Sequence, residues 1–340
     1  MELSKLVDNV TAAVRDMHNK TVEKFLDKTF EIKLCWVNEE RFAASASKSK
    51  NGEVYTINIS LFIIERLANY AADFNTIRLS KDFKEKLSNI NDIDKDLFSV
   101  EMAPSFFNER MIKTLVMWVY YHELAHIVQS HIMFSDYIGM SIVNDELFLL
   151  EEYQEKNLDP AVSHLLEYSA DSEAIFNITR LLISSNKVFV LYKHEFWAFC
   201  VGLYYVLSGF YDESQGAGHR EVRGSHPDPA MRMRMMMYSF DRTANVLFHY
   251  PLNSDWLGRT GAGRNVMLDA VRVANLCVEY PGVGIKKEFY DNIARDDIVC
   301  DEYSSLLFKK WQDIGQKIIK KYFGNTIDGI LFLSKEDNIS

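Results

Sequence analysis

Cysteine and proline are scarce in this chain, since its 340 residues contain four cysteines and six prolines. The cysteines, which lie far apart and form no Cys-x-x-Cys pair, are Cys35, Cys200, Cys277 and Cys300. This spacing indicates neither a disulfide framework nor a zinc site built from cysteines. A reducing compartment fits it best.

Long apolar runs are also missing. The first ten residues carry charged side chains and lack the continuous apolar core of a signal peptide. The nearest approach to a membrane span is residues 196–211, which fall short of the roughly 20 apolar residues that a span needs. We therefore expect a cytoplasmic protein that does not contact a membrane, and a buried helix at residues 196–211.

Basic residues are fewer than acidic residues in this chain. Lysine and arginine number 38 against 48 aspartates and glutamates, which gives a net charge of -10. Such a surface disfavours binding of nucleic acid through phosphate neutralisation, so we expect no nucleic-acid partner. A hydrophobic content of 48% is sufficient for a sizeable core.

The hydrophobic pattern changes along the chain from helix to strand and back to helix. Leu3 to Phe25 has apolar residues at helical spacing, and three short β-type runs follow at residues 30–37, 41–47 and 54–60. The Asn51-Gly52 pair between the last two runs is a strong hairpin motif. Further helices are expected at residues 60–74, 108–134, 160–183, 188–211 and 229–240, and over much of the C-terminal hundred residues.

This order of elements predicts an α+β fold that is predominantly helical, with a small N-terminal antiparallel β-sheet before the long helix at residues 108–134. We assign residues 1–240 to one domain and residues 241–340 to a helical C-terminal extension packed on it. A regulatory lid is conceivable for residues 243–340, but packing support is the simpler interpretation.

The apolar run from Tyr120 to Val128 contains two histidines and a glutamate. In a buried helix these groups cost free energy unless they are paired or bind a metal. His122 and His126 lie four residues apart on one helical face, which is the spacing that two ligands of one zinc ion need. Glu123 could hold the metal-bound water as a general base.

A catalytic zinc site needs a third protein ligand and leaves the fourth position to water. The best candidate is Glu167, on a later expected helix. Asp171 lies four residues further on the same helix, so one of the two could bind metal while the other accepts a hydrogen bond from a ligand imidazole. The residues that compete for the third position are His164, Glu173, Glu151 and Glu152.

Three more motifs follow in order along the chain. They are His131, five residues after His126; Glu167, Ala170, Asp171 and Ala174 in a Glu-x-x-Ala-Asp-x-x-Ala pattern; and His226-Pro227 followed by Arg232. With the metal helix, these motifs resemble those of the gluzincin metallopeptidases represented by the HtpX heat-shock proteases and the CAAX prenyl endopeptidases. At the metal helix the chain is also similar to the phage-exclusion protease Lit.

The resemblance implies a zincin-like metallopeptidase fold, a zinc cofactor and hydrolysis of peptide bonds in a protein or peptide substrate. It implies metal ligation by His122, His126 and Glu167, with Glu123 as general base. It also implies that His226 stabilises the oxyanion, from a loop at residues 215–229 shaped by glycines and prolines. The chain departs from this family by having no convincing membrane helix, which leaves its substrate and biological role open.

Other residues have plainer interpretations. His131 lies off the ligand face of an ideal helix, so a solvated or packing role is preferred. Arg232 could tie the loop of His226 to the core by pairing with a carboxylate. The strand at residues 54–60 could bind an extended peptide by strand addition.

Two alternatives to a protease stand beside this interpretation. The metal-containing fold could be a binding or sensing module without physiological proteolysis. The intact Glu123 argues against it, because a purely structural zinc site closes its fourth position with another ligand. The histidines could also be merely structural, which would require three motif matches to be accidental.

Overall fold

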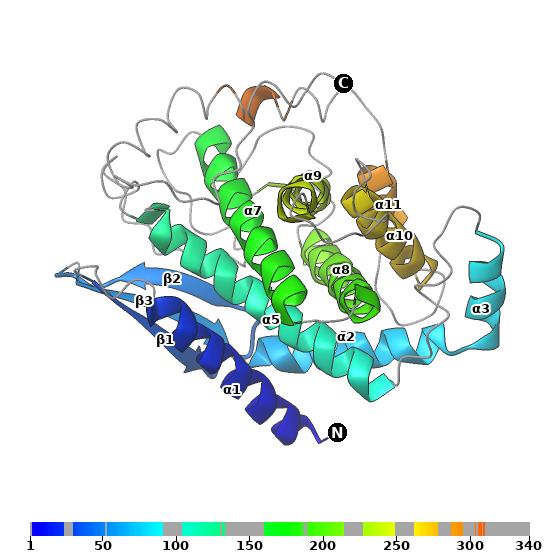
Figure 1. The fold of residues 1–340 in the computed structure, drawn as a ribbon, viewed down its shortest axis with the longest axis horizontal. Coiled ribbons are helices and arrows are strands. Elements are labelled where there is room, and N and C mark those ends of the chain that lie inside the picture. Colours follow the sequence, from blue (N-terminus) through cyan, green and yellow to red (C-terminus); the bar gives the residue numbers. More distant parts are fainter. Residues whose placement is uncertain are drawn as a thin grey trace.

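Helices make up most of the part of the chain that the computed structural model describes (Figure 1). The described residues are 2–23, 30–51, 53–90, 104–129, 131–132, 160–185, 189–213, 227–248, 262–277, 287–294, 303, 305–307 and 309. The helices are α1 (Leu3–Val22), α2 (Phe62–Arg78), α3 (Lys81–Ser88), α5 (Pro104–Val128), α7 (Pro160–Ser185), α8 (Phe189–Glu213), α9 (Pro229–Phe248), α10 (Ala262–Leu276) and α11 (Lys287–Ala294). The strands are β1 (Glu31–Val37), β2 (Ala44–Lys48) and β3 (Val54–Ser60).

The predicted α+β fold class is confirmed. A three-stranded sheet lies near the N-terminus, before the long helix α5, and helices form most of the rest of the described chain. The predicted opening helix is α1, whose buried side chains recur at helical spacing as Leu6, Val10, Val14 and Met17.

The sheet has the strand order β1-β3-β2, so β3 is the central strand. β2 pairs antiparallel with β3 through the predicted hairpin, in which the Ser49 amide donates to the Val54 carbonyl at 2.7 Å. β1 pairs parallel with β3, from Glu31 opposite Val54 to Val37 opposite Ser60. The antiparallel pairing predicted for the whole sheet is therefore wrong for this pair. The chain reverses before β2 and again after it, and β3 rather than β2 lies next to β1.

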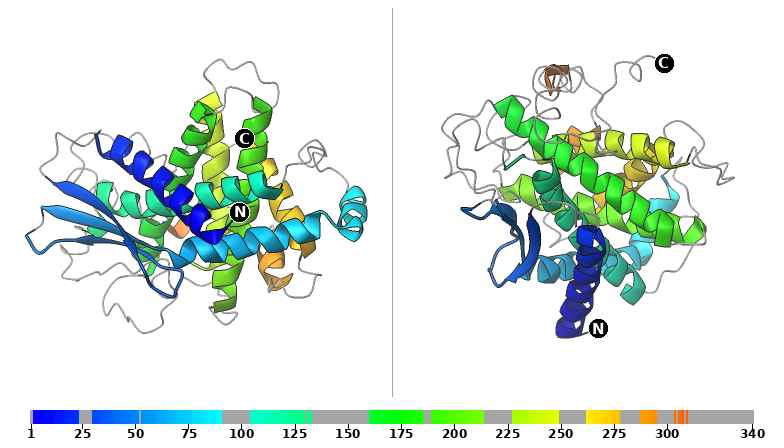
Figure 2. Two further views of the ribbon diagram at one scale, coloured as in Figure 1. Left: turned by 90° about the horizontal axis from the view of Figure 1, so that it is seen from below. Right: turned by 60° about the vertical axis from the view of Figure 1, so that its left-hand side comes forward.

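Helix α5 runs through the middle of the molecule, with the sheet on one side and α7 and α8 on the other (Figures 1 and 2). It contacts α1, α2, α7, α8, β2 and β3. Every side chain from Thr114 to Ile127 is buried, including the rings of Trp118 and Tyr120. Over these residues α5 has no solvated face. Polar side chains at its centre are therefore held away from water.

Helix α8 lies close to α5 at Gly202. A Cβ atom at this position would lie 2.7 Å from Met111 Cγ, so the missing side chain allows the two helices to approach. The apolar part of α8 is buried from Phe196 to Ser208, as expected from the sequence. In the described part of the chain, no helix is both long and apolar enough to cross a membrane.

Helix α9 runs through residue 240, where the first predicted domain ends. α10 contacts α8 and α9, and α11 contacts α9 and α10. The helices on the two sides of this position therefore pack on one another, while the division into two domains stays a prediction.

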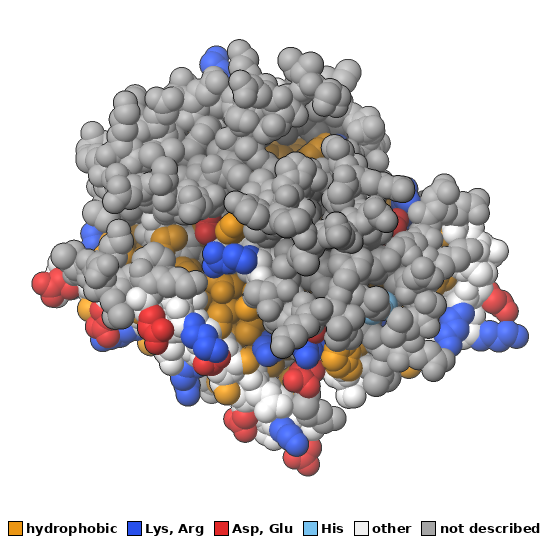
Figure 3. Space-filling model, viewed as in Figure 1, with side chains coloured by type: hydrophobic (Ala, Val, Ile, Leu, Met, Phe, Trp, Pro, Cys, Tyr) orange, Lys and Arg blue, Asp and Glu red, His pale blue; other side chains and the backbone are white. Residues whose placement is uncertain are grey.

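The described surface carries charges of both signs. Figure 3 shows basic and acidic side chains interspersed along the lower edge of that view. Several form ion pairs within one helix, such as Lys20 with Asp16 at 2.6 Å and Lys86 with Asp82 at 3.3 Å. Pairs of this kind contribute only about 0.3–0.5 kcal/mol each.

Candidate metal centre

Two helices supply three buried residues that could hold a metal ion: His122 and His126 on α5 and Glu167 on α7. The two imidazole Nε2 atoms are 3.2 Å apart. Nε2 of His122 lies 3.5 Å from Glu167 Oε2, and Nε2 of His126 lies 3.5 Å from Glu167 Oε1. One helical turn separates the histidines and α7 packs against α5, so the three groups converge where the helices meet.

These separations suit one bound cation. Zinc binds imidazole nitrogen and carboxylate oxygen at about 2.0–2.2 Å in tetrahedral geometry, which places two ligand atoms roughly 3.3–3.6 Å apart. The observed separations of 3.2 and 3.5 Å are close to these values. The donor set therefore fits a divalent cation of the size of zinc.

The three side chains are almost completely shielded from solvent. Their exposed fractions are 0% for His122, 1% for His126 and 3% for Glu167. Burying a carboxylate and two imidazoles at one point costs free energy unless they are paired or bound to a metal. A divalent cation would neutralise the carboxylate and bind a lone pair of each ring. The burial of this group is thus a second indication of a metal centre.

The other nitrogen of His122 faces a buried ion pair. His122 Nδ1 lies 3.0 Å from Asp171 Oδ1. Arg232, on α9, donates from Nε to Asp171 Oδ2 at 2.9 Å and from Nη2 to Asp171 Oδ1 at 2.8 Å. A carboxylate in this position fixes the ring orientation of a metal-binding histidine and raises its basicity. Arg232 therefore does pair with a carboxylate of the core.

The same contacts shift the pKa values of these groups. Burial by itself would lower the pKa of His122, but Asp171 and Glu167 raise it to about 10. Burial by itself would raise the pKa of Asp171, but the charge of Arg232 and the contact with His122 lower it below its ordinary value. Burial would lower the pKa of Arg232, whereas Asp171, Glu167 and Glu123 raise it. The positive charge of Arg232 thus interacts favourably with the buried carboxylates of Asp171, Glu167 and Glu123.

Replacing Arg232 by alanine is expected to lower the free energy of unfolding by about 3–5 kcal/mol. The reason is that Asp171 would stay buried without its bidentate ion pair with Arg232. The measurement is chemical denaturation of the metal-free protein, so that bound metal does not contribute. Arg272→Ala is the control, since its pair with Asp269 at 3.5 Å is partly exposed. Equal unfolding free energies for Arg232→Ala and the wild type would show that the buried pair does not stabilise the fold.

Glu123 follows His122 on α5 and is fully buried. Its carboxylate is among the charges that raise the pKa of Arg232, so it lies within electrostatic reach of that guanidinium. It is not one of the three residues of the metal cluster. The structure therefore places Glu123 outside the three possible ligands, and its role as general base stays a prediction.

His131 lies closer to the ligands than the sequence indicates. Its side chain is 3% exposed, and its Nδ1 atom lies 2.9 Å from Nδ1 of His126. The solvated role predicted from ideal helix geometry is therefore wrong, whereas the packing role predicted beside it agrees with this burial. α5 ends at Val128, before His131, so the geometry of one ideal helix extended over both histidines does not give the observed contact.

Two residues that competed with Glu167 for the metal have other partners. His164 is buried, and its Nδ1 forms a hydrogen bond with the hydroxyl of Tyr303 at 3.0 Å. Glu173 accepts a hydrogen bond from Asn177 Nδ2 at 2.8 Å. Among the described residues, the structure brings Glu167 and neither of these two to the histidine pair.

Tyr303 is a neighbour of the centre that no motif marks in the sequence. Its ring packs in one small apolar cluster with Leu165, Met235 and Leu307. Burial and nearby carboxylates, including that of Glu167, raise its pKa. The residue comes from the C-terminal part of the chain, and only tertiary packing on α7 and α9 brings it to this position.

His226, the predicted oxyanion donor, lies outside the described residues, and so do Glu151 and Glu152. Their roles stay predictions. The described chain resumes just after His226, where Asp228 caps α9 by accepting a hydrogen bond from the Ala230 amide at 2.9 Å. This capped helix is the one that carries the arginine of the network.

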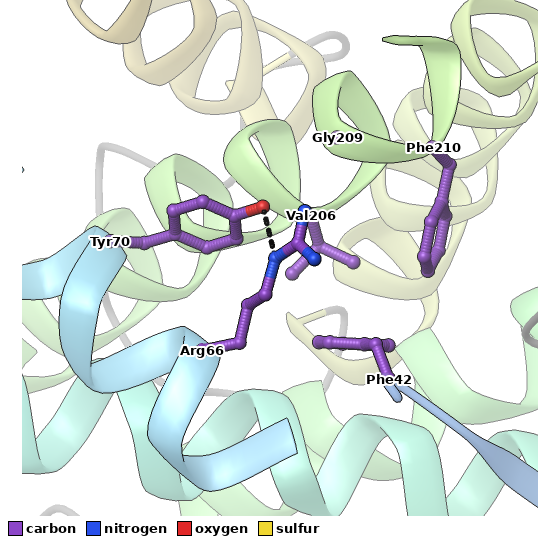
Figure 4. Close-up of a pocket in the computed structure, with 6 residues that line it drawn as sticks. All are labelled: Phe42, Arg66, Tyr70, Val206, Gly209 and Phe210. Atoms are coloured by element: carbon purple, nitrogen blue, oxygen red, sulfur yellow. Dashed lines mark hydrogen bonds between the residues drawn. The ribbon is translucent and has the colours of Figure 1, made fainter. Parts of the chain in front are cut away.

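A small pocket lies elsewhere in the fold. It is lined by Phe42, Arg66, Tyr70, Val206, Gly209 and Phe210, none of which belongs to the metal centre (Figure 4). In Figure 4 Arg66 and Tyr70 project from α2, and Arg66 Nε donates to Tyr70 Oη at 3.1 Å. The pocket has room for about one water molecule, so it does not indicate a ligand site.

Comparisons of this chain with protein family models, with curated proteins and with solved structures found no match. The resemblance to gluzincin metallopeptidases therefore depends on the sequence motifs alone and stays a prediction. The geometry and chemistry of the metal centre are the basis for proposing a function.

Proposed function

We propose that this protein is a zinc-dependent endopeptidase of the gluzincin type, which hydrolyses peptide bonds of a protein substrate. The main support is the cluster of His122, His126 and Glu167, which contains no fourth protein ligand among the described residues. Structural zinc sites usually have four protein ligands, whereas catalytic sites have three and keep one position for water and substrate. Glu123 lies on the same helix as the histidines, directly after the first of them.

In this proposal, bound zinc supplies a Lewis acid that polarises the scissile carbonyl and lowers the pKa of water. Glu123 takes a proton from the attacking water on its carboxylate and gives it to the leaving amine. Asp171, held by Arg232, keeps the ring of His122 in its ligating orientation. We assign oxyanion binding to His226 on the strength of the family resemblance, a role typically worth about 3 kcal/mol.

An extended substrate requires a free strand edge if it binds by strand addition. β3, the strand predicted for this role, is central in the sheet, and both of its edges are occupied by β1 and β2. Substrate pairing with β3 is therefore excluded. In the described chain β2 is an edge strand and contacts α5, the helix that carries both histidines. We accordingly propose β2 (Ala44–Lys48) as the strand that binds the peptide.

The alternative function, a binding or sensing module with a bound metal, is favoured by one observation. The ligand side chains are between 0% and 3% exposed, which is typical of an ion that is enclosed rather than offered to a substrate. The two functions differ in their need for Glu123, because only hydrolysis uses a general base. Biological activity that is equal in Glu123→Gln and wild type would favour the alternative.

Removal and return of the metal test the proposed activity. The protein is stripped with a chelator, dialysed, and incubated with a library of proteome-derived peptides in the presence and absence of zinc. New peptide termini, identified by mass spectrometry, are expected with zinc and absent without it, because zinc supplies the Lewis acid. Binding of about one zinc per chain without any new termini would argue against an endopeptidase.

A further inference from the structure

We propose that His131 is a positioning residue of the metal centre, which orients the ligand His126 by accepting a hydrogen bond as a neutral imidazole. The inference rests on the proposed metal centre and names a residue of that same site. It assigns no catalytic step to His131. The contact that carries it is the 2.9 Å separation between the two Nδ1 atoms.

The geometry determines which nitrogen of His126 can bind the ion. Nε2 of His126 lies 3.2 Å from Nε2 of His122 and 3.5 Å from Oε1 of Glu167, so it faces the other two ligands. A neutral imidazole that binds metal through Nε2 carries its proton on Nδ1. Nδ1 of His126 is therefore the donor toward His131.

The same contact determines the form of His131. Two imidazole nitrogens can share a hydrogen bond only if one of them lacks a proton. Because His126 supplies the proton, Nδ1 of His131 must be the acceptor, and the single proton of that ring lies on Nε2. The rings meet edge to face, with centroids 4.9 Å apart and planes inclined by 70°.

The two ligand histidines are thus supported by different chemistry. The partner of His122 is the carboxylate of Asp171, which is itself held by Arg232. The partner of His126 is a neutral ring. A buried centre that already contains the carboxylates of Glu123, Glu167 and Asp171 would become still more negative if a fourth carboxylate oriented His126. A histidine supplies the acceptor without adding charge.

The hydrogen bond between His126 and His131 is buried, so its loss is expected to affect the metal centre. His126 is 1% exposed and His131 is 3% exposed, so water cannot readily replace either partner. Loss of the acceptor would remove this hydrogen bond from the buried His126 N–H and allow the ring to turn from its ligating orientation. The expected consequence is weaker metal binding.

The test compares two variants of the full chain by zinc affinity, measured in competition with a chelator. His131→Leu removes the acceptor and is expected to weaken zinc binding by about 10- to 100-fold. His131→Asn places an amide oxygen near the position of Nδ1 and is expected to keep the affinity close to that of the wild type. The absorption spectrum of the cobalt-substituted protein is expected to change in the leucine variant and not in the asparagine variant.

His18→Leu is the matched control. His18 is also buried and forms a hydrogen bond through Nδ1, with Tyr120 Oη at 2.9 Å, but it does not contact a ligand. Its loss is expected to lower the unfolding temperature and to leave zinc affinity unchanged. If His131→Leu bound zinc as tightly as the wild type, or if His131→Asn lost affinity to the same extent as His131→Leu, the inference would be overturned.

These outcomes are independent of the proposed reaction. A wild-type chain that binds zinc and cleaves no peptide would remove the endopeptidase but leave the role of His131 to be decided by affinity. A wild-type chain that binds no zinc would overturn both.

Discussion

Replacing Glu123 by glutamine is expected to abolish peptide cleavage while leaving about one zinc bound per chain. The substitution keeps the size of the side chain and removes its ability to take a proton. General bases typically contribute 10²- to 10⁴-fold to the rate, so turnover is expected to fall by about that factor. Zinc is expected to stay bound because Glu123 is not among the three residues of the cluster.

The measurement counts new peptide termini per unit time and zinc per chain in the same preparations. Glu173→Gln is the matched control, since it removes a partly buried carboxylate of α7 whose pKa is raised by burial and which does not belong to the metal cluster. It is expected to cleave at close to the wild-type rate. Undiminished cleavage by Glu123→Gln would refute the assignment of the general base and, with it, the proposed mechanism.

Replacing Glu167 by alanine is expected to remove most of the bound zinc. Outer partners of metal ligands contribute roughly 10- to 100-fold to metal affinity, so the loss of a direct ligand is expected to cost more than about 100-fold. The two histidines that remain, 3.2 Å apart at Nε2, could still contact an ion but would not neutralise its charge. Cleavage is expected to disappear together with the metal.

Zinc content by mass spectrometry and zinc affinity by titration check this result. Glu167→Gln is the comparison that separates charge from shape, because its amide oxygen could still reach the ion. Circular dichroism of both variants shows whether the fold is kept. Full zinc content in Glu167→Ala would show that another residue supplies the third ligand, and Glu151 and Glu152 would then be the first to test.

The metal helix could be predicted from sequence because its pattern is local. Residues four apart on a helix always share a face, so the spacing of His122 and His126 already places two imidazoles together. The third ligand is less determined by sequence, since several acidic residues and His164 have suitable positions along the chain. The resemblance to gluzincins is what implies Glu167 as the third ligand, and the structure brings it to the histidines.

The strand order of the sheet and the position of His131 are two features that local sequence patterns do not predict. The Asn51-Gly52 hairpin predicts the antiparallel pair β2–β3, but nothing local decides that β1 lies beside β3 in parallel. Ideal helical geometry extended past the end of α5 predicts that His131 lies off the ligand face, whereas its Nδ1 atom lies 2.9 Å from Nδ1 of His126. A periodic pattern of residues predicts the directions of side chains only within the helix or strand that has this period.

The α+β class and the helix with His122, Glu123 and His126 follow from the sequence alone, and the residue types on that helix indicate a metal ion. Hydrophobic periodicity and short spacings decide these features, because they depend on neighbours within one or two turns. Three-dimensional packing decides that Glu167 rather than His164 lies beside the histidine pair, and that His131 contacts His126. The first of these contacts joins two separate helices, which the packing of α5 against α7 brings together at long range. The second joins residues only five apart, at the end of α5.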